Sequence, residues 1–219
     1  MKVLSVNIGS PRPNPWKRSG TTGIDKRPVD GPVAVTAPGP KGTGGVGLAG
    51  DRVYDVEHHG GDDQAVYAYA REDLDAWQSE LERPLVNGVF GENLTTLGVD
   101  VTGALIGERW RVGPDLVLEV SCARIPCSTF QGWLERSGWI KRFTQAAIPG
   151  AYLRVIEPGD IRAGDPVEIT SRPSHDVTIA LMFRALTREP ELLPRVLPAG
   201  DALPEETRAM IRRRGASQE

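Results

Sequence analysis

The chain has 219 residues, of which 39% are hydrophobic and 25% are charged, as in a globular protein with one medium-sized domain and a small addition. Its formal net charge of −3 provides no basic field that would attract nucleic acid. No apolar run approaches the ~20 residues that cross a bilayer. We therefore expect neither nucleic acid nor a membrane as a partner.

Short strands are predicted along the first three quarters of the chain, where apolar and polar residues alternate. The abundance of Gly (25) and Pro (18) also favours short elements joined by turns. The predicted strands cover residues 2–8, 32–36, 65–69, 115–121, 151–156 and 166–170, the last two joined by a turn at Pro158-Gly159. Residues 10–31 are predicted to be loop, and the glycine-dense residues 37–50 are either a linker or a backbone that approaches something closely.

Helical periodicity occurs in two regions. Leu74, Trp77 and Leu81 are spaced i, i+3 and i+7, which predicts an amphipathic helix over residues 70–81. After Pro173, the spacing of apolar residues predicts a helix over residues 176–188, and a second helix begins near Pro204.

The change of pattern divides the chain into a mostly β unit, residues 1–170, and a small helical unit, residues 171–219. The helical unit either covers one end of the β unit or offers a platform for a partner reductase or a homodimer.

Two adjacent histidines, His58 and His59, precede a Gly-Gly pair. Adjacent side chains on a strand face opposite ways, so a shared metal would need a kink. From these residues alone, a catalytic or binding role and a structural one are equally supported.

Cys127 follows a predicted strand and a proline, with Arg124 three residues before it. A nearby guanidinium favours the thiolate, which is both a metal ligand and a nucleophile. The alternative is a buried, inert thiol, which is the interpretation we favour for Cys122. Both cysteines lie in one segment, so they do not form a disulfide framework, and we expect a reducing, cytoplasmic setting.

A third segment, residues 88–94, places Asn93 among glycines, where its amide either binds a ligand or satisfies a turn. Several familiar patterns are absent: Cys-x-x-Cys, His-Glu-x-x-His, the nucleotide phosphate loop and Gly-x-Ser-x-Gly.

Taken together, these segments resemble the MOSC domain family, the C-terminal module of molybdenum-cofactor sulfurases. The resemblance is to the bacterial YiiM type, which is linked to resistance to N-hydroxylated purines. It rests on GLAGDRVYDVEHHGGDDQAVYAY, VFGENL, ARIPC and GAYLRVIEPGDIRAGDPVEI, in that order. The resemblance implies a mostly β (α+β) fold, in which a β-barrel-like MOSC domain surrounds a pocket and is followed by a three-helix C-terminal unit.

The resemblance also implies a site. Cys127 is expected to be the ligand of molybdenum, or to carry sulfur for the molybdenum cofactor (Mo-molybdopterin), and His59 is expected to act with it in catalysis. The expected cofactor-binding residues are Lys26, Arg27, Asp51, Arg52, His58, His59, Gly60, Asn93, Arg124 and Tyr152. The basic ones suit a phosphate. Gln64 stands where many members have Lys, and Ser128 and Thr129 replace bulkier residues, so one anion contact and the substrate pocket are expected to differ.

Three functions follow as hypotheses. The first is a molybdenum-dependent reductase of a small N-hydroxylated substrate; because the chain has no iron–sulfur cysteines, its electrons would come from a separate reductase protein. The second is a carrier of molybdenum cofactor or sulfur without turnover. The third is a cysteine hydrolase with Cys127 as nucleophile and His58 or His59 as base.

Overall fold

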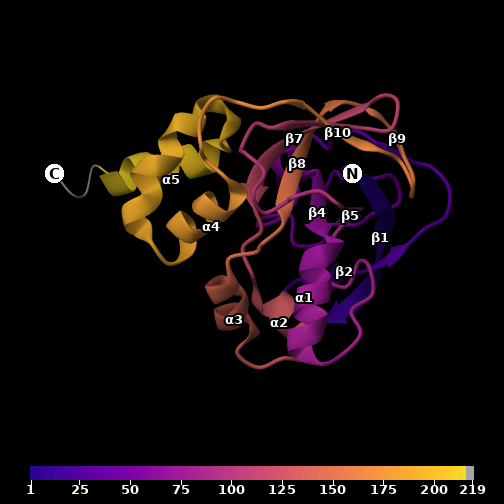
Figure 1. The fold of residues 1–219 in the computed structure, drawn as a ribbon. Helices are drawn as coiled ribbons and strands as arrows, with labels where there is room; N and C mark the ends of the chain where they lie inside the picture. Colours follow the sequence, from indigo (N-terminus) through magenta and orange to yellow (C-terminus); the bar gives the residue numbers. More distant parts are fainter. Residues whose placement is uncertain (216–219) are drawn as a thin grey trace.

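The computed structural model describes residues 1–215 and is built on one large twisted sheet (Figure 1). Its eight strands lie in the order β10-β6-β7-β8-β4-β5-β1-β2, and β3 and β9 form a separate pair. The strands are β1 (Lys2–Asn14), β2 (Gly20–Pro28), β3 (Val33–Val35), β4 (Val66–Ala70), β5 (Leu94–Leu97), β6 (Arg109–Val112), β7 (Leu116–Ala123), β8 (Ala151–Glu157), β9 (Gly159–Ile161) and β10 (Val167–Ser171).

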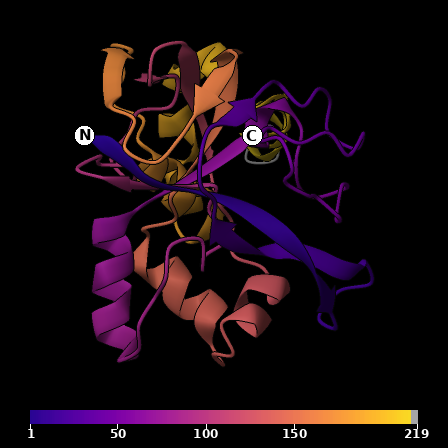
Figure 2. The same cartoon turned by 90° about the vertical axis from the view of Figure 1, so that its right-hand side faces the viewer.

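The helices are grouped in two places. They are α1 (Arg71–Leu81), α2 (Ser128–Trp133), α3 (Trp139–Ala146), α4 (Ile179–Thr187), α5 (Glu205–Gly215) and two 3-10 helices, η1 (Asp62–Gln64) and η2 (Pro190–Ala202). Figure 2 shows α1, α2 and α3 together below the sheet. The fold is thus a mixture of strands and helices, with the strand-rich part first and a helical tail last.

The expected β-barrel needs correction. Within the described residues the edge strands β2 and β10 do not pair, so the sheet stays open. An isolated bridge between Lys2 and Pro166 brings the start of β1 beside the residue that precedes β10. The sheet therefore curls towards a barrel without a continuous ladder around it.

A hairpin of β1 and β2 replaces the loop predicted over residues 10–31, which was wrong. The hairpin register runs from Asn7–Pro28 to Asn14–Gly20, with an irregularity after Ser10. β1 pairs with β5 only as far as Val6, so its farther half has a free side. The prolines in that half remove no ladder bond there, which explains why they did not prevent a strand.

Of the other predicted elements, some are confirmed and one is wrong. The helix over residues 70–81 is confirmed as α1, and the predicted helices in the tail correspond to α4 and α5. The predicted turn at Pro158-Gly159 was wrong, because Gly159 begins β9, which pairs with β3, whereas β10 pairs with β6. β5, β6, α2 and α3 were not predicted.

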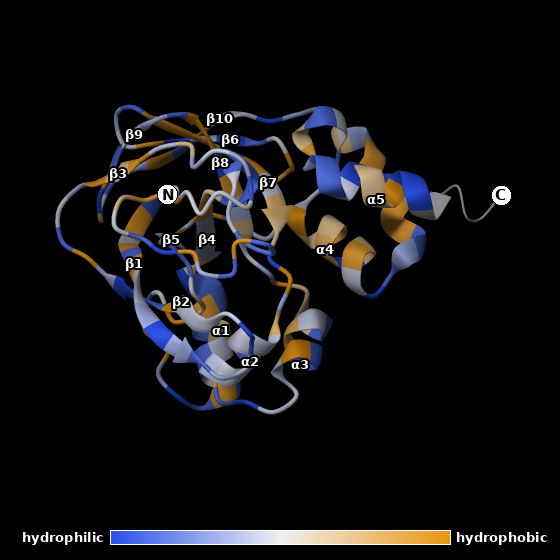
Figure 3. Ribbon diagram, turned by 180° about the vertical axis from the view of Figure 1, so that it is seen from behind, coloured by the Kyte–Doolittle hydropathy of each residue, from blue (hydrophilic) through white to orange (hydrophobic). Residues whose placement is uncertain are grey.

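The helical tail contacts the end of the sheet beside β7 (Figure 3). Its three segments are α4, η2 and α5, and η2 has a kink at Gly200. The chain enters the tail through backbone hydrogen bonds from Ile106 to Val177 (2.9 Å) and from Ile179 to Ala104 (3.0 Å). The division at residue 170 stays a prediction. No helix in the described part of the chain is both long and apolar enough to cross a membrane.

An aromatic cluster joins α1, α2 and α3 to the sheet. Its members are Trp77, Phe90, Phe130, Trp139 and Phe143, all almost completely buried. The rings of Phe130 and Phe143 have centroids 5.2 Å apart, and Phe143 also meets Phe183 of the tail. Such edge-to-face contacts add to the free energy of simple apolar burial.

We expect Phe143→Ala to lower the free energy of unfolding by about 3–5 kcal/mol, because it leaves a cavity where all three helices and the tail meet. Urea denaturation followed by tryptophan fluorescence measures this loss. Leu197→Ala, at an exposed position, is the control and is expected to change stability by less than about 0.5 kcal/mol. A loss below about 1 kcal/mol for Phe143→Ala would contradict the importance of the cluster.

Candidate functional site

A cavity of about 910 Å³, including open space at its mouth, lies between β2, residues 38–64 and the start of α2. Among the residues that line it are Lys26, Asp51, Arg52, His59, Gly60, Asn93, Arg124, Cys127 and Tyr152. Residues expected from distant parts of the chain are therefore brought together in one place. Its size suits a small-molecule ligand.

Two expected residues do not line this cavity. Arg27 is 61% exposed and its Nε donates to Asp25 at 2.6 Å, because it follows Lys26 on β2 and so faces the other way. His58 is 62% exposed and its ring lies against Asp55. Their predicted role in cofactor binding is not supported by this arrangement.

A buried polar network forms one wall of the cavity. Lys26 Nζ lies 2.5 Å from Asp51 Oδ2, and Asn93 Nδ2 donates to the same oxygen at 2.8 Å. Burial would raise the pKa of Asp51, but the attraction of Lys26 and the hydrogen bonds from Lys26, Asn93 and the Gly9 N–H lower it overall. The carboxylate is thus ionised and cancels the charge of Lys26.

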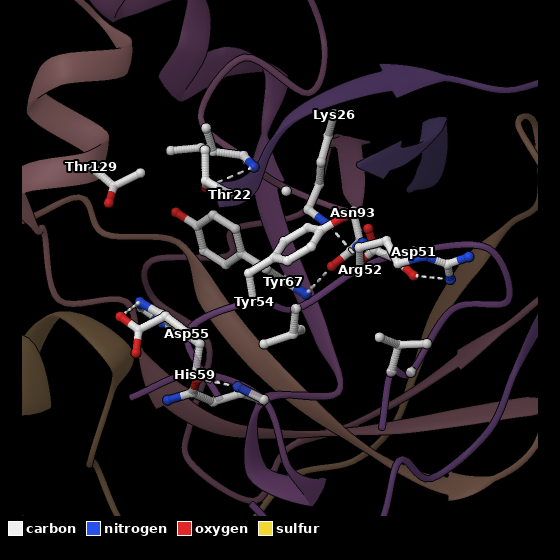
Figure 4. Close-up of a pocket in the computed structure, with 18 of the residues that line it drawn as sticks. Thr22, Lys26, Asp51, Arg52, Tyr54, Asp55, His59, Tyr67, Asn93 and Thr129 are labelled. Atoms are coloured by element: carbon white, nitrogen blue, oxygen red, sulfur yellow. Dashed lines mark hydrogen bonds and ion pairs between the residues drawn. The ribbon is translucent and has the colours of Figure 1, made fainter. Parts of the chain in front are cut away.

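Arg52 lies at the rim of this wall. It is an exposed residue that lines the cavity, and its Nη1 donates to the Asp51 carbonyl at 2.9 Å. Among the described residues, no salt bridge involves Arg52. Its guanidinium can therefore turn towards an anion in the cavity. Figure 4 shows Lys26, Asp51, Arg52 and Asn93 on one side of the view and Asp55 and His59 on the other.

Cys127 lies at the start of α2, partly exposed to the cavity. Burial on its own would raise the pKa of its thiol. A hydrogen bond from His59, the charge of Arg124 and the Phe130 N–H outweigh burial and lower the pKa to about 6. The thiolate is therefore the main form at neutral pH. By contrast, Cys122 is buried, which confirms it as a core residue, and burial raises the pKa of its thiol to about 12.

Arg124 is a buried cation beside Cys127. Its Nη1 donates to the Phe90 carbonyl at 2.6 Å, and its Cζ lies 3.6 Å from the centre of the Phe130 ring. No carboxylate forms a salt bridge with it among the described residues. Buried charges usually have a partner; Tyr67, Tyr152 and Cys127 all act on Arg124, and of these only Cys127 is ionised at neutral pH, because the pKa values of both tyrosines are raised.

Asp55, in the same motif as His58 and His59, is a residue that the sequence analysis did not single out. Asp55 accepts from Lys17 Nζ at 2.6 Å and lies 2.9 Å from His58 Nδ1, whereas His59 Nε2 is 4.0 Å away. Burial alone would raise the pKa of Asp55, but Lys17 and both histidines lower it to about 2. The two histidines thus separate, with His59 towards the cavity and His58 towards solvent.

Other lining residues were also missed, notably Asn14, Thr22, Tyr54 and Tyr67. Tyr67 was hidden inside a predicted strand, and the first two lie in the hairpin that was predicted as loop. Tyr67 could have been identified only by predicting which residues of the strand face the cavity. Its hydroxyl donates to the Pro149 carbonyl at 2.7 Å, which holds the Tyr67 ring in place as part of the cavity wall.

The glycine-dense segment contributes close backbone packing. A Cβ on Gly47 would lie 2.0 Å from the Ala65 carbonyl oxygen, and one on Gly45 would lie 2.0 Å from that of Pro38. Both glycines line the cavity. Residues 37–50 are therefore a backbone that approaches other segments closely, and not a linker.

The described part of the chain contains no group of three or more His, Cys, Asp or Glu side chains placed to hold a metal ion. A metal bound at Cys127 would take its other ligands from a non-protein group. A thiolate suits a soft, thiophilic metal, and the cationic side chains suit an anionic organic ligand.

Comparison with known proteins agrees with this site. The profile of the MOSC domain matches residues 55–168, just over half of the chain. The uncharacterised protein YflK of Bacillus subtilis is 32% identical over 83% of this chain and 79% of its own length. Protein YiiM of Escherichia coli is 31% identical over 87% of this chain and 84% of its own length.

A protein of Gibberella moniliformis named "Reductase" is 31% identical over 78% of this chain but only 29% of its own length. Among solved structures, YiiM from Geobacillus stearothermophilus superposes with a TM-score of 0.77 at 27% identity, covering 97% of this chain and 98% of that chain. The extent of these matches, together with the cavity around Cys127, shows that this chain belongs to the MOSC domain family and, within it, to the YiiM type.

Proposed function

We propose that this protein holds a molybdenum cofactor in the cavity, with Cys127 as the thiolate ligand of the metal, and reduces N-hydroxylated compounds such as N-hydroxylaminopurines. The observation that carries the proposal is the Cys127 thiol, whose pKa is lowered to about 6 inside a cavity with two guanidiniums. MOSC domains are in general associated with this cofactor.

The residues present fit such a group. Cys127 offers one soft ligand, and the surrounding cavity leaves the remaining metal positions to the cofactor's own sulfur and oxygen atoms. Arg52 provides positive charge for an anionic pterin phosphate, whereas Lys26 is already neutralised by Asp51 and Arg124 faces the Cys127 thiolate. Lys26 therefore contributes hydrogen bonds and rigidity more than net charge.

The cofactor, when bound, supplies the two-electron redox chemistry. Reduction of an N–OH group to N–H takes two electrons and two protons and releases water. His59 lies in the cavity beside Cys127, so a ring nitrogen can hold a proton for this step. Tyr67 and Tyr152, whose ring centroids are 4.9 Å apart, wall the cavity with flat surfaces suited to a planar substrate.

The electrons would come from a separate protein. The Gibberella relative named a reductase is more than three times as long as the part that matches this chain, so it has room for further domains. This chain has only the two cysteines already described and so lacks the ligands for an iron–sulfur cluster.

A cysteine hydrolase is the second candidate, because Asp55, His59 and Cys127 follow one another in space. The geometry favours it less. Both carboxylate oxygens of Asp55 are bonded to other groups, Lys17 and His58, and its distance of 4.0 Å from His59 exceeds a hydrogen bond. Asp55 therefore does not orient His59 as a hydrolase triad requires.

In the metal-free protein, we expect alkylation of Cys127 by iodoacetamide to follow the thiolate fraction, rising with pH to a plateau with a midpoint near pH 6. His59→Gln removes a group that lowers the pKa, so its midpoint is expected to move to higher pH. Mass spectrometry of the labelled peptide measures both. Cys122 is the internal control and should stay unmodified, because it is buried and its pKa is raised to about 12. A midpoint above pH 8 for the unchanged protein would contradict this.

We expect protein purified from a cofactor-competent host to contain molybdenum and to show pterin fluorescence. With reduced methyl viologen as donor, it should reduce N-hydroxylaminopurine. Cys127→Ser is expected to lose more than about tenfold in both molybdenum content and rate, since even residues around a ligand change metal affinity by 10–100-fold.

Cys122→Ser is the matched control and should retain both. Wild-type activity in Cys127→Ser, or no molybdenum in the unchanged protein, would overturn the proposed function. Molybdenum retained without any reduction would favour the carrier hypothesis instead.

A further inference from the structure

Positive charge is concentrated in the hairpin of β1 and β2, which we call the basic hairpin and define as residues 10–28. In a chain of net charge −3, it carries a single carboxylate, Asp25, and the basic residues Arg12, Lys17, Arg18, Lys26 and Arg27. Such an asymmetry generates a local positive potential on an otherwise acidic molecule.

Part of this charge stays uncompensated at the surface. Lys17 and Lys26 are paired with Asp55 and Asp51 outside the hairpin. Arg12 and Arg27, 52% and 61% exposed, share the one carboxylate of Asp25, and Arg18 is exposed with no salt bridge among the described residues.

The basic hairpin stands out from the body of the molecule (Figure 2), and β1 becomes more hydrophilic towards its tip (Figure 3). β2 is an edge strand, so no further strand covers this side. Trp16 at the tip is 41% exposed, which is unusual for so large an aromatic residue. An exposed aromatic among cations is typical of an interaction surface.

The tip of the hairpin is in direct contact with the candidate site. The Trp16 ring lies against the backbone of α2, since a Cβ on Gly132 would be 2.1 Å from it, and Ser128 Oγ donates to the Trp16 carbonyl at 3.3 Å. On the other side, Lys17 bonds to Asp55 in the segment that carries His59. A protein that bound the tip would therefore lie within a few residues of Cys127.

We infer that the basic hairpin is the docking surface for the electron donor, an acidic flavin protein of the flavodoxin type. This inference rests on the proposed function, because only a reductase needs an electron donor. The charge and exposure of the basic hairpin do not depend on that function. Oxidation of the donor's fully reduced flavin releases two electrons and two protons, and the N–OH group takes up two electrons and two protons to give N–H and water. Opposite charges steer the partners together, and Trp16 anchors them.

The probe is a purified flavodoxin of net negative charge. Its binding to the full chain is measured by calorimetry at low and high salt, without any need for cofactor. We expect Arg18→Glu to weaken binding roughly three- to tenfold at low salt, with the difference disappearing near 0.5 M salt. The double variant Arg12→Gln, Arg18→Glu should weaken it further.

Arg111→Glu is the matched control. It makes the same change of charge at a half-exposed arginine of β6, next to the opposite edge of the sheet. Its binding is expected to stay within twofold of the unchanged protein. Equal effects of Arg18→Glu and Arg111→Glu, or no effect of either, would overturn the inference.

A second measurement uses cofactor-loaded protein. Arg18→Glu should slow reduction of N-hydroxylaminopurine when reduced flavodoxin is the donor, but not when reduced methyl viologen is. An equal loss with both donors would show that the hairpin acts on the site itself and not through docking. If neither donor supports reduction while flavodoxin binding depends on Arg18, the proposed function fails and the docking surface stands. Self-association that Arg18→Glu abolishes would make the hairpin a dimer interface and overturn the inference.

Discussion

A buried guanidinium that forms no salt bridge with any carboxylate of the described residues is the constraint on which the site depends. Arg124 lies 7% exposed, over the Phe130 ring and against the Phe90 carbonyl. Removing such a charge from water is costly unless negative charge is nearby. The Cys127 thiolate provides it, and in return its own pKa falls. The aromatic cluster is thus both the core beneath the helices and the support of a reactive sulfur.

Three cations that line the cavity are balanced in different ways. At Lys26 the charge is cancelled by Asp51, and Asn93 locks the pair to β4 through the Tyr67 N–H. At Arg124 the charge faces the Cys127 thiolate, whereas Arg52, at the rim, has no salt bridge among the described residues and can meet an anion. The cavity therefore has a rigid, nearly neutral wall at Lys26 and Asp51, and the unpaired guanidinium of Arg52 at the rim of that wall is the cation that an anionic ligand can reach.

The sequence predicted most of the regular elements and the central cysteine, but not how the side chains divide between inside and outside. Periodicity was sufficient for α1, because its burial comes from a single face. It failed for β1 and β2, because their prolines and glycines are typical of loops, whereas they form a hairpin in which the far half of β1 pairs on one side only. Lys26 and Arg27 are adjacent in sequence and separated by the pleat, so a resemblance that named both could not choose between them. Asp55 lies inside the quoted motif but was not singled out, because its importance arises from a turn that brings it close to both histidines.

The helical tail is tied into the sheet by its first residues. Backbone hydrogen bonds join Ala104 and Ile106 to Val177 and Ile179, and Phe183 touches the aromatic cluster through Phe143. An exchange of tails between relatives would therefore have to carry the complementary residues before β6 and in α3 along with it. Recombination at residue 170 alone would join surfaces that had never been matched, so the tail and the sheet are expected to have diverged as one unit.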